Sequence, residues 1–480
     1  MLFTSIDFGI FLPIVFILYW FATNKSLRLQ NKLLFVSSYV FYAWWDYRFL
    51  FLLLISTCIG FFAGIKIHTS QSATAKTRLV WLSISAHLLL LGFFKYYNFL
   101  ADSFMDAFSL FGLTINATSI SIILPVGISF YTFHGISYIL DIYKGKLKPV
   151  ENFIDYAVFV SFFPLLVAGP IERAGHLLPQ LQRRREFDYL KSTDGLRQIL
   201  WGFFKKIVVA DSCAEYVNMV FNNIPGHSAS TLAFGVLFFS FQIYCDFSGY
   251  SDIAIGTARL FGIELLQNFS FPYFSSSIPE FWRRWHISLS SWFRDYVFFP
   301  LERQRVKYIG QSLNILIVFF LTGLWHGANW TFIVWGVLHG FYLIFSSVFG
   351  GVRIPQTYLP YSTRWRNISS VIKILSTFIL VSLTWIFFRA QDVGQAITYI
   401  TLLFSRSITT PPELPSDVWT IIVFICIFTL IEWHGRNQQY ALAKLGHNWP
   451  RPLRWGLYYI FIVVILFYAG SQQQFIYFQF

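Results

Sequence analysis

Long apolar runs recur along the whole chain, and they constrain its fold more than any other feature. A helix needs about 20 mostly apolar residues to cross the hydrocarbon core of a bilayer. Only helices and closed barrels satisfy their backbone groups in lipid, and these runs lack the alternation of barrel strands. The sequence therefore predicts an all-α multi-pass membrane protein. Its candidate spans are residues 8–22, 33–45, 48–66, 79–96, 119–140, 154–170, 196–212, 229–250, 312–327, 329–349, 369–389, 418–434 and 453–470.

Composition supports a lipid environment. Charged residues make up 12 % of the chain and hydrophobic residues 56 %, whereas a soluble protein carries about a quarter charged residues. Several of the spans are too short to cross alone. We therefore expect about eleven crossings, with the remaining segments re-entrant or interfacial. No internal repeat divides the chain, so we expect a single membrane domain over residues 1–480.

Loop charges predict the orientation. The first seven residues contain no Lys or Arg, whereas the next connection contains Lys25, Arg28 and Lys32. Because cytoplasmic loops collect positive charge, we expect the N-terminus to lie outside. We expect the membrane to be the cell (inner, cytoplasmic) membrane. The net charge of +13 is explained by such loops and by contact with anionic membrane lipids. No basic stripe lies on a soluble domain, so we expect no nucleic-acid partner.

The alternation of loop charge breaks at residues 154–170. If this segment crossed, the basic run from Arg173 to Lys191 would lie outside. Phe163–Pro164 and Gly169–Pro170 instead indicate a segment that dips into the membrane and returns. Irregular backbone at that depth requires surrounding protein or a water-filled cavity, so this is a first indication of a cavity.

The stretch 256–311 is neither a span nor a polar loop. We expect a helix over residues 281–296, lying at the cytoplasmic interface or buried in the bundle. Arg283 and Arg284 are candidates for binding a phosphate-bearing donor, or else anionic lipid. On that helix, one stripe would hold Trp285, Leu289, Trp292, Tyr296 and Phe299, and another Arg283 and Arg294.

Two histidines are candidates for chemistry. His326 lies between Gly323 and Gly327 at the junction of two short apolar segments, with Trp325 and Asn329 beside it. An ionisable side chain at membrane depth is a functional hypothesis by default; the alternative is a structural histidine in a helix break. We expect the two glycines to make room for a substrate. His286 has a weaker case, because a histidine among Trp and Arg can simply anchor at the headgroups.

Asp246 and Asp252 flank a Ser-Gly break at the end of an apolar run. Uncompensated charge there is costly, so each carboxylate requires a partner. We expect that partner to be Arg259, Arg283 or Arg284, and a supporting ion pair is favoured over direct catalysis.

Several common active-site motifs are missing from the sequence. It contains no G-x-S-x-G elbow, Walker loop, G-x-G-x-x-G fingerprint or H-E-x-x-H pair. Serine-triad hydrolysis, ATP-driven pumping and zinc chemistry therefore lack their usual supports. We expect no metal and no tightly bound cofactor.

Taken together, the motifs resemble those of the membrane-bound O-acyltransferase family. Within it, the chain is similar to the bacterial branch that contains alginate O-acetylase and the D-alanyl transfer protein of teichoic acids; its ending favours the former type. The matching stretches cover nearly the whole chain: Phe35–Trp44, Leu124–Phe133, Ala168–Ile171, Asp246–Asp252, Phe281–Asp295, Gly323–Ala328 and Phe475–Phe480.

The resemblance implies a helical bundle around a central tunnel that links a cytoplasmic donor to an acceptor on the other side. His326 matches the family's catalytic histidine and would act as general base. His286 matches its frequent partner, which would hydrogen-bond the donor or acceptor, or stabilise the oxyanion. The acyl donor would be acetyl-CoA or an acyl-carrier-protein thioester.

The resemblance further implies O-acetylation of an extracellular or cell-surface polysaccharide, with an extracytoplasmic acetyltransferase as partner. D-Alanyl or other acyl transfer to a teichoic-acid-like or lipid acceptor is the alternative within this class. A polysaccharide or lipid transporter is the alternative from another class. Transporters often carry broken helices in corresponding positions of two halves, and no such symmetry is visible.

Overall fold

The computed structural model describes residues 1–113, 120, 122–304, 310–349, 368–416, 418–471 and 473–476. Every regular element in these ranges is a helix, which confirms the all-α prediction. The chain divides into two compact units. Unit 1 comprises Met1–Gly195 and Ala254–Leu266, and unit 2 comprises Leu196–Ile253 and Gln267–Phe480. The expectation of one membrane domain over residues 1–480 stays a prediction.

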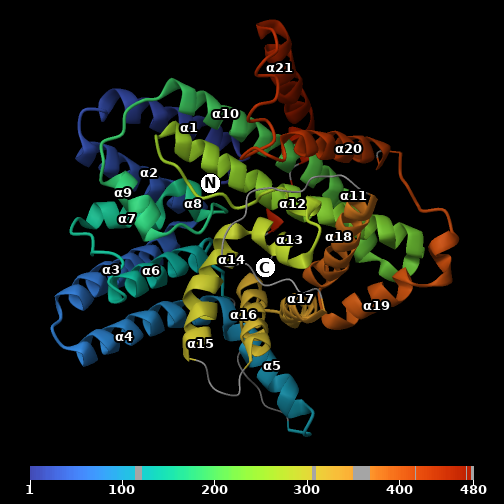
Figure 1. Ribbon diagram of the computed structural model, residues 1–480, viewed down its shortest axis with the longest axis horizontal. Helices are drawn as coiled ribbons and strands as arrows, with labels where there is room; N and C mark the ends of the chain where they lie inside the picture. Colours follow the sequence, from blue (N-terminus) through green and yellow to red (C-terminus); the bar gives the residue numbers. More distant parts are fainter. Residues whose placement is uncertain are drawn as a thin grey trace. The chain divides into compact units, whose positions relative to one another are not determined.

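Unit 1 is built from helices that pack along their lengths; α3, α4 and α6 lie side by side (Figure 1). It also holds the first residues of α10 (Tyr189–Phe203) and the end of α12 (Ala229–Leu260). Its other elements are α1 (Ile6–Ile17), η1 (Leu18–Ala22), α2 (Leu27–Asp46), η2 (Tyr47–Phe49), α3 (Leu50–Thr69), α4 (Ala73–Leu91), η3 (Gly92–Tyr96), α5 (Tyr97–Ser109), α6 (Ile128–Tyr143), α7 (Phe153–Ser161), α8 (Phe163–Leu166) and α9 (Ala174–Leu181).

Local sequence explains these helices. Ser26 and Ser72 cap α2 and α4 by accepting hydrogen bonds from backbone N–H groups of the first turn. On α3, Gly60 and Gly64 lie one turn apart, and a Cβ at either position would overlap the ring of Tyr156 or Tyr138. Small residues at this spacing let membrane helices approach closely, here α7 and α6 against α3.

The segment at residues 154–170 is interrupted, as its prolines predict. Helix α7 ends at Ser161, and Phe162 leaves the helical conformation before the four-residue α8. Residues 156–172 are all buried. A nine-residue helix is about 14 Å long, roughly half the hydrocarbon core of a bilayer. The break therefore agrees with a segment that does not cross as one helix.

Unit 2 contains the remaining elements. Gly323 of α16 and Gly336 of α17 have no room for a Cβ, because backbone atoms of the facing helix occupy that space. Besides most of α10 and α12, the elements are η4 (Phe204–Ala210), α11 (Asp211–Asn222), η5 (Ile224–Gly226), η6 (Pro272–Phe274), α13 (Ile278–Arg284), α14 (Ile287–Phe293), η7 (Arg294–Phe298), α15 (Phe299–Gln304), α16 (Gln311–His326), α17 (Trp330–Phe349), α18 (Ile368–Arg389), α19 (Val393–Leu403), η8 (Arg406–Thr409), α20 (Val418–Gly435), α21 (Arg451–Tyr468) and η9 (Ala469–Ser471).

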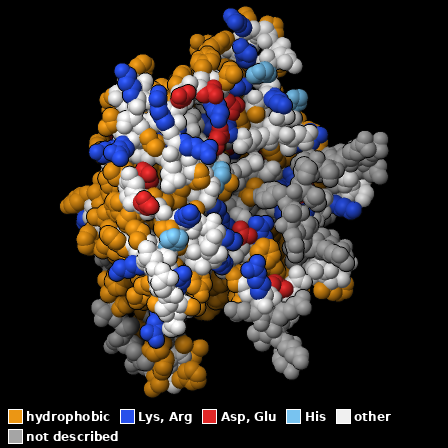
Figure 2. Space-filling model, turned by 60° about the vertical axis from the view of Figure 1, so that its left-hand side comes forward, with side chains coloured by type: hydrophobic (Ala, Val, Ile, Leu, Met, Phe, Trp, Pro, Cys, Tyr) orange, Lys and Arg blue, Asp and Glu red, His pale blue; other side chains and the backbone are white. Residues whose placement is uncertain are grey.

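Large apolar side chains cover much of the outside of the helices. Leu89 of α4 is 72 % exposed and Phe467 of α21 is 80 % exposed, and hydrophobic side chains cover much of the left-hand part of the face drawn in Figure 2. Such surfaces are stable in lipid and unfavourable in water. They agree with a multi-pass membrane protein.

Among the described residues, seven helical stretches are long and apolar enough to cross a membrane. Two of them, Leu27–Thr69 and Ala73–Ser109, contain 43 and 37 residues, more than the roughly 20 that one crossing needs. The shorter apolar helices are Ile6–Ala22, Phe153–Leu166, Gln311–His326 and Val393–Leu403. The number of crossings, about eleven, stays a prediction.

Candidate functional site

His286 lies at a sharp break in the chain. Helix α13 ends at Arg284 and α14 begins at Ile287, and between them His286 has a φ of 43°. Non-glycine residues rarely adopt this left-handed conformation, and strained residues gather at functional sites. The continuous helix expected over residues 281–296 is therefore wrong. Of the predicted stripe, Trp285 is separated by the break, whereas Leu289, Trp292, Tyr296 and Phe299 follow on the helical stretch formed by α14, η7 and α15.

The physical reason for this break lies in residues 268–270. The backbone N–H of Ile287 donates to the carbonyl of Asn268 at 2.9 Å, and the N–H of Ser270 donates to the carbonyl of Arg284 at 2.9 Å. These bonds replace the helical ones that are lost at His286. The sequence gives no signal for them, because they join segments whose local patterns are unrelated.

Asn268 holds the imidazole of His286. The Nδ1 of His286 lies 3.0 Å from Oδ1 of Asn268, and the hydroxyl of Ser288 donates to the same oxygen at 2.9 Å. The Nδ2 of Asn268 donates to Ser251 at 3.2 Å. His286 and Asn268 are both fully buried. Burial lowers the pKa of His286 to about 3, so the imidazole is neutral at physiological pH.

His326 is the last residue of α16 and is buried in a ring of aromatic side chains. Its imidazole centroid lies 5.0 Å from those of Trp325 and Trp335 and 5.2 Å from that of Phe388. The centroids of His326 and His286 are 6.2 Å apart, and the ring of Trp325 lies 5.7 Å from that of His286. The two histidines and the tryptophan that the sequence singles out are therefore brought together.

The glycines around His326 have a structural use. A Cβ at Gly323 would overlap the carbonyl of Phe332, and a Cβ at Gly327 would overlap the ring of Phe332. The expectation that these glycines make room for a substrate is therefore wrong. Instead they let α17 approach the end of α16, which fixes the position of His326 among its aromatic neighbours.

Asp246 and Asp252 form buried ion pairs with two adjacent lysines. An oxygen of Asp246 lies 2.7 Å from the Nζ of Lys206, which also contacts Asp211 at 2.7 Å. Asp252 lies 2.5 Å from the Nζ of Lys205. The lysines belong to the π-helical segment η4, which packs where Gly202 and Gly249 allow the backbones to approach. These carboxylates are therefore charge partners, as the sequence predicts.

The predicted identity of those partners is wrong. Arg259 pairs with Asp194 and Glu264, and Arg284 pairs with Glu280 at 2.6 Å. The lysines take their place because the apolar run 196–212 passes beside α12. Two adjacent charges inside an apolar run were a signal for this pairing, since ionisable residues at membrane depth require partners.

The remaining predicted residues pack against neighbouring rings or cap a helix. Trp285 is fully buried, with its ring 4.9 Å from that of Trp385. Asn329 caps α17, because its Oδ1 accepts from the N–H of Thr331 at 3.0 Å and its Nδ2 donates to the carbonyl of Gln391 at 2.8 Å. Of the predicted ending, Phe475 packs against Tyr250, whereas residues 477–480 lie outside the described ranges.

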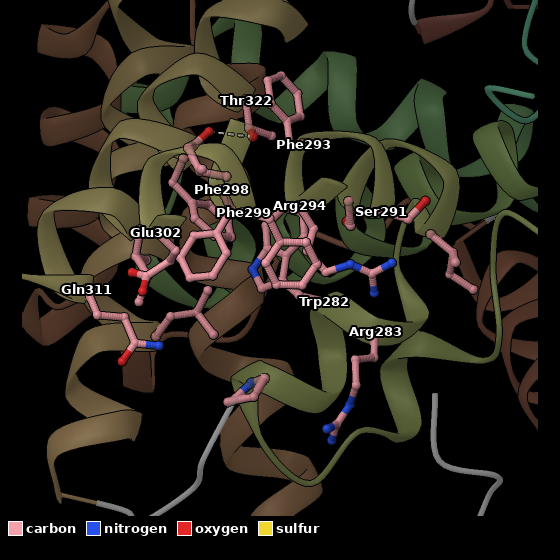
Figure 3. Close-up of a pocket in the computed structure, with 17 residues that line it drawn as sticks. Trp282, Arg283, Ser291, Phe293, Arg294, Phe298, Phe299, Glu302, Gln311 and Thr322 are labelled. Carbon is pink, nitrogen blue, oxygen red and sulfur yellow. Dashed lines mark hydrogen bonds between the residues drawn. The ribbon is translucent and has the colours of Figure 1, made fainter. Parts of the chain in front are cut away.

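Arg283 lines a cavity of about 300 Å³ in unit 2. Figure 3 shows aromatic side chains such as Trp282 and Phe299 gathered in the lining, with Arg283 at its edge. The Nη1 of Arg283 is buried without a hydrogen-bond partner among the described residues. The lining includes Ile287, next to His286, and Thr322, one helical turn before His326. Neither histidine is in the lining, but the cavity reaches these neighbours of both, and it combines an apolar wall with the cation of Arg283.

Known proteins show similarity over nearly all of the chain. A model of the membrane-bound O-acyltransferase family matches residues 149–388, which include both histidines. The chain is 35 % identical to the probable alginate O-acetylase AlgI of Pseudomonas putida over 98 % of both proteins. It is 36 % identical to the peptidoglycan O-acetyltransferase of Helicobacter pylori, over 81 % of this chain and 76 % of that protein. It is 31 % identical to the teichoic acid D-alanyltransferase of Bacillus subtilis, over 52 % of this chain and 65 % of that protein.

Proposed function

Because the chain belongs to the membrane-bound O-acyltransferase family, we propose that it moves an acetyl group from a cytoplasmic thioester across the membrane for O-acetylation of an extracellular polysaccharide. The chain is a multi-pass membrane acyltransferase. The proposed acetyl transfer rests mainly on the buried pair of His326 and His286, whose ring centroids lie 6.2 Å apart. Family membership also argues against the transporter alternative.

In the proposed reaction His326 acts as general base. The acceptor hydroxyl loses its proton to His326 while its oxygen attacks the thioester carbonyl. The carbon–sulfur bond then breaks, and the leaving thiolate takes a proton from the imidazolium. The aromatic shell of Trp325, Trp335 and Phe388 keeps bulk water away, which protects the thioester from hydrolysis.

The cavity beside the histidines supports a site for the donor. Both donor candidates, acetyl-CoA and an acyl-carrier-protein thioester, carry phosphate groups. A guanidinium recognises phosphate well, and ligand pockets typically combine apolar walls with a few polar groups. In this reading Arg283 binds the donor. Arg284 does not, since Glu280 and the carbonyl of Ser270 already occupy its guanidinium.

Changing Arg283 to Gln should raise the KM for the thioester donor about tenfold with little change in kcat. Loss of one hydrogen bond to a charged group costs about 1.5 kcal/mol, and binding rather than chemistry is affected. The measurement is the initial rate of transfer by protein in liposomes, as a function of donor concentration.

Arg303→Gln is the matched control for this prediction. Arg303 is an exposed arginine on α15, and it is not part of the cavity lining. Its replacement should leave the KM unchanged. Equal KM values for Arg283→Gln and the wild type would remove Arg283 from the donor site.

The acetylated polymer is proposed from the relatives. The matches that cover most of this chain are named for O-acetylation of alginate and of peptidoglycan. A second candidate is D-alanyl transfer, because the chain also matches a teichoic acid D-alanyltransferase. That match covers a smaller part of the chain. For the acetylation route we further propose an extracytoplasmic acetyltransferase as partner and the inner membrane as location, with the N-terminus outside.

Mass spectrometry of ester groups on the host's surface polymers distinguishes these candidates. A deletion strain and the same strain carrying the wild-type gene are treated with mild base, and the released acids are identified. Release of acetate that depends on the gene supports the proposal. Release of alanine instead would favour the second candidate, and identical ester content in both strains would contradict acyl transfer to a surface polymer.

A further inference from the structure

The environment of His286 decides which of its two nitrogens carries the proton. Its Nδ1 faces Oδ1 of Asn268 at 3.0 Å, and a carbonyl oxygen can only accept. In the structure the Asn268 amide presents Oδ1 to His286 and Ser288, and its Nδ2 donates to Ser251. With this orientation of the amide, Nδ1 is the protonated nitrogen, and Nε2 carries a lone pair.

The protonation state follows from burial and agrees with this tautomer. His286 is fully buried, and burial lowers its pKa to about 3, so that the imidazolium form is not populated at neutral pH. Nε2 is itself buried, without a hydrogen-bond partner among the described residues. The nearby rings include those of Phe247 at 4.7 Å, Trp325 at 5.7 Å, His326 at 6.2 Å and Phe269 at 6.3 Å.

We propose that Asn268 is a positioning residue that fixes His286 as the Nδ1–H tautomer, so that Nε2 accepts a hydrogen bond from an N–H or O–H group of a bound substrate. The proposal rests on the acyl-transfer function. It excludes one role for His286, because an oxyanion is stabilised by hydrogen-bond donors and Nε2 has no hydrogen to donate. Ser288 and Ser251 act on His286 through Asn268.

The tautomer can be measured directly in the wild-type protein. The ¹⁵N NMR spectrum of the histidine-labelled protein in lipid is recorded at neutral pH, and His286 is assigned by difference with a His286→Gln variant. We expect an unprotonated Nε2 and a protonated Nδ1. A protonated Nε2 would overturn the proposal whatever the outcome of any activity assay.

The functional consequence is tested with Asn268→Ala. We expect kcat to fall about 10–100-fold, as for the loss of other residues that orient a functional histidine, with KM for the donor nearly unchanged. Introducing Nδ1-methylhistidine at position 286 in the Asn268→Ala background should restore part of kcat. The methyl group blocks Nδ1 and leaves the lone pair on Nε2, without any help from Asn268.

The control is Ser240→Ala. Ser240 is a buried α12 residue bonded to Ser382 at 3.0 Å, and its loss tests the general effect of removing a buried hydrogen bond in unit 2. It should leave kcat near that of the wild type. A wild-type kcat for Asn268→Ala, or no recovery with the methylated histidine, would contradict the positioning role. If His326→Ala nevertheless abolishes transfer, the acyl-transfer function stands and only the role of Asn268 fails.

Discussion

Replacing His326 by alanine should lower the rate of acyl transfer by about 10²–10⁴, the range expected when a general base is lost. The aromatic shell and the cavity at Arg283 remain, so the variant should still bind donor with a KM near that of the wild type. The measurement is transfer of a labelled acetyl group from acetyl-CoA by protein in liposomes. His326 is buried at a helix end, so its replacement also requires a check of folding.

Two variants separate chemistry from folding in this experiment. His326→Gln retains a polar side chain of similar length but cannot act as a base, and it should be as inactive as His326→Ala. His434→Ala changes a histidine at the end of α20, outside the proposed site, and should remain active. A His326→Gln variant with the wild-type rate would exclude His326 as general base.

Replacing Lys206 by methionine should lower the free energy of unfolding by about 3–5 kcal/mol, the cost of removing one partner from a buried ion pair. The change leaves Asp246 and Asp211 facing each other without their shared cation. Lys206 is 1 % exposed, so water cannot replace the lost charge. The measurement is the melting temperature of the purified protein in detergent. The fraction of protein that remains monodisperse after heating is measured as well.

Lys444→Met provides the matched control. Lys444 lies in unit 2 as well, but it is exposed to solvent, so losing its charge should change stability by less than about 0.5 kcal/mol. Similar melting temperatures for Lys206→Met and Lys444→Met would show that Lys206 is not needed to stabilise the buried carboxylates of Asp246 and Asp211.

The fold class could be predicted from the sequence because lipid imposes a strong constraint. Apolar runs of sufficient length must form helices, and the prolines near residue 164 indicate the break between α7 and α8. The single helix over residues 281–296 was a wrong prediction for a physical reason. Its apolar periodicity is helical on both sides of His286. The break depends on a hydrogen bond that the carbonyl of Asn268 accepts and on one that the N–H of Ser270 donates.

The site could be predicted in part. His326 could be predicted because an ionisable residue at membrane depth is rare and usually functional. The family resemblance added His286 as its partner, and the structure brings the two rings together. Asn268 and Lys206 were not predicted to act with them. No local sequence pattern indicates that an asparagine in an irregular stretch contacts a histidine. The pairing of Lys206 with Asp246 could be predicted only by knowing which apolar run lies beside α12.

The role of His326 as catalytic base in acyl transfer is tested most directly by the acyl-ester content of the host's surface polymer in three strains. These carry the deletion, the wild-type gene and His326→Ala, with matched amounts of protein in the membrane. We expect gene-dependent acetyl ester in the wild type and loss of that ester both in the deletion strain and in the His326→Ala strain. Full ester content with His326→Ala would contradict the assignment of His326 as the catalytic base.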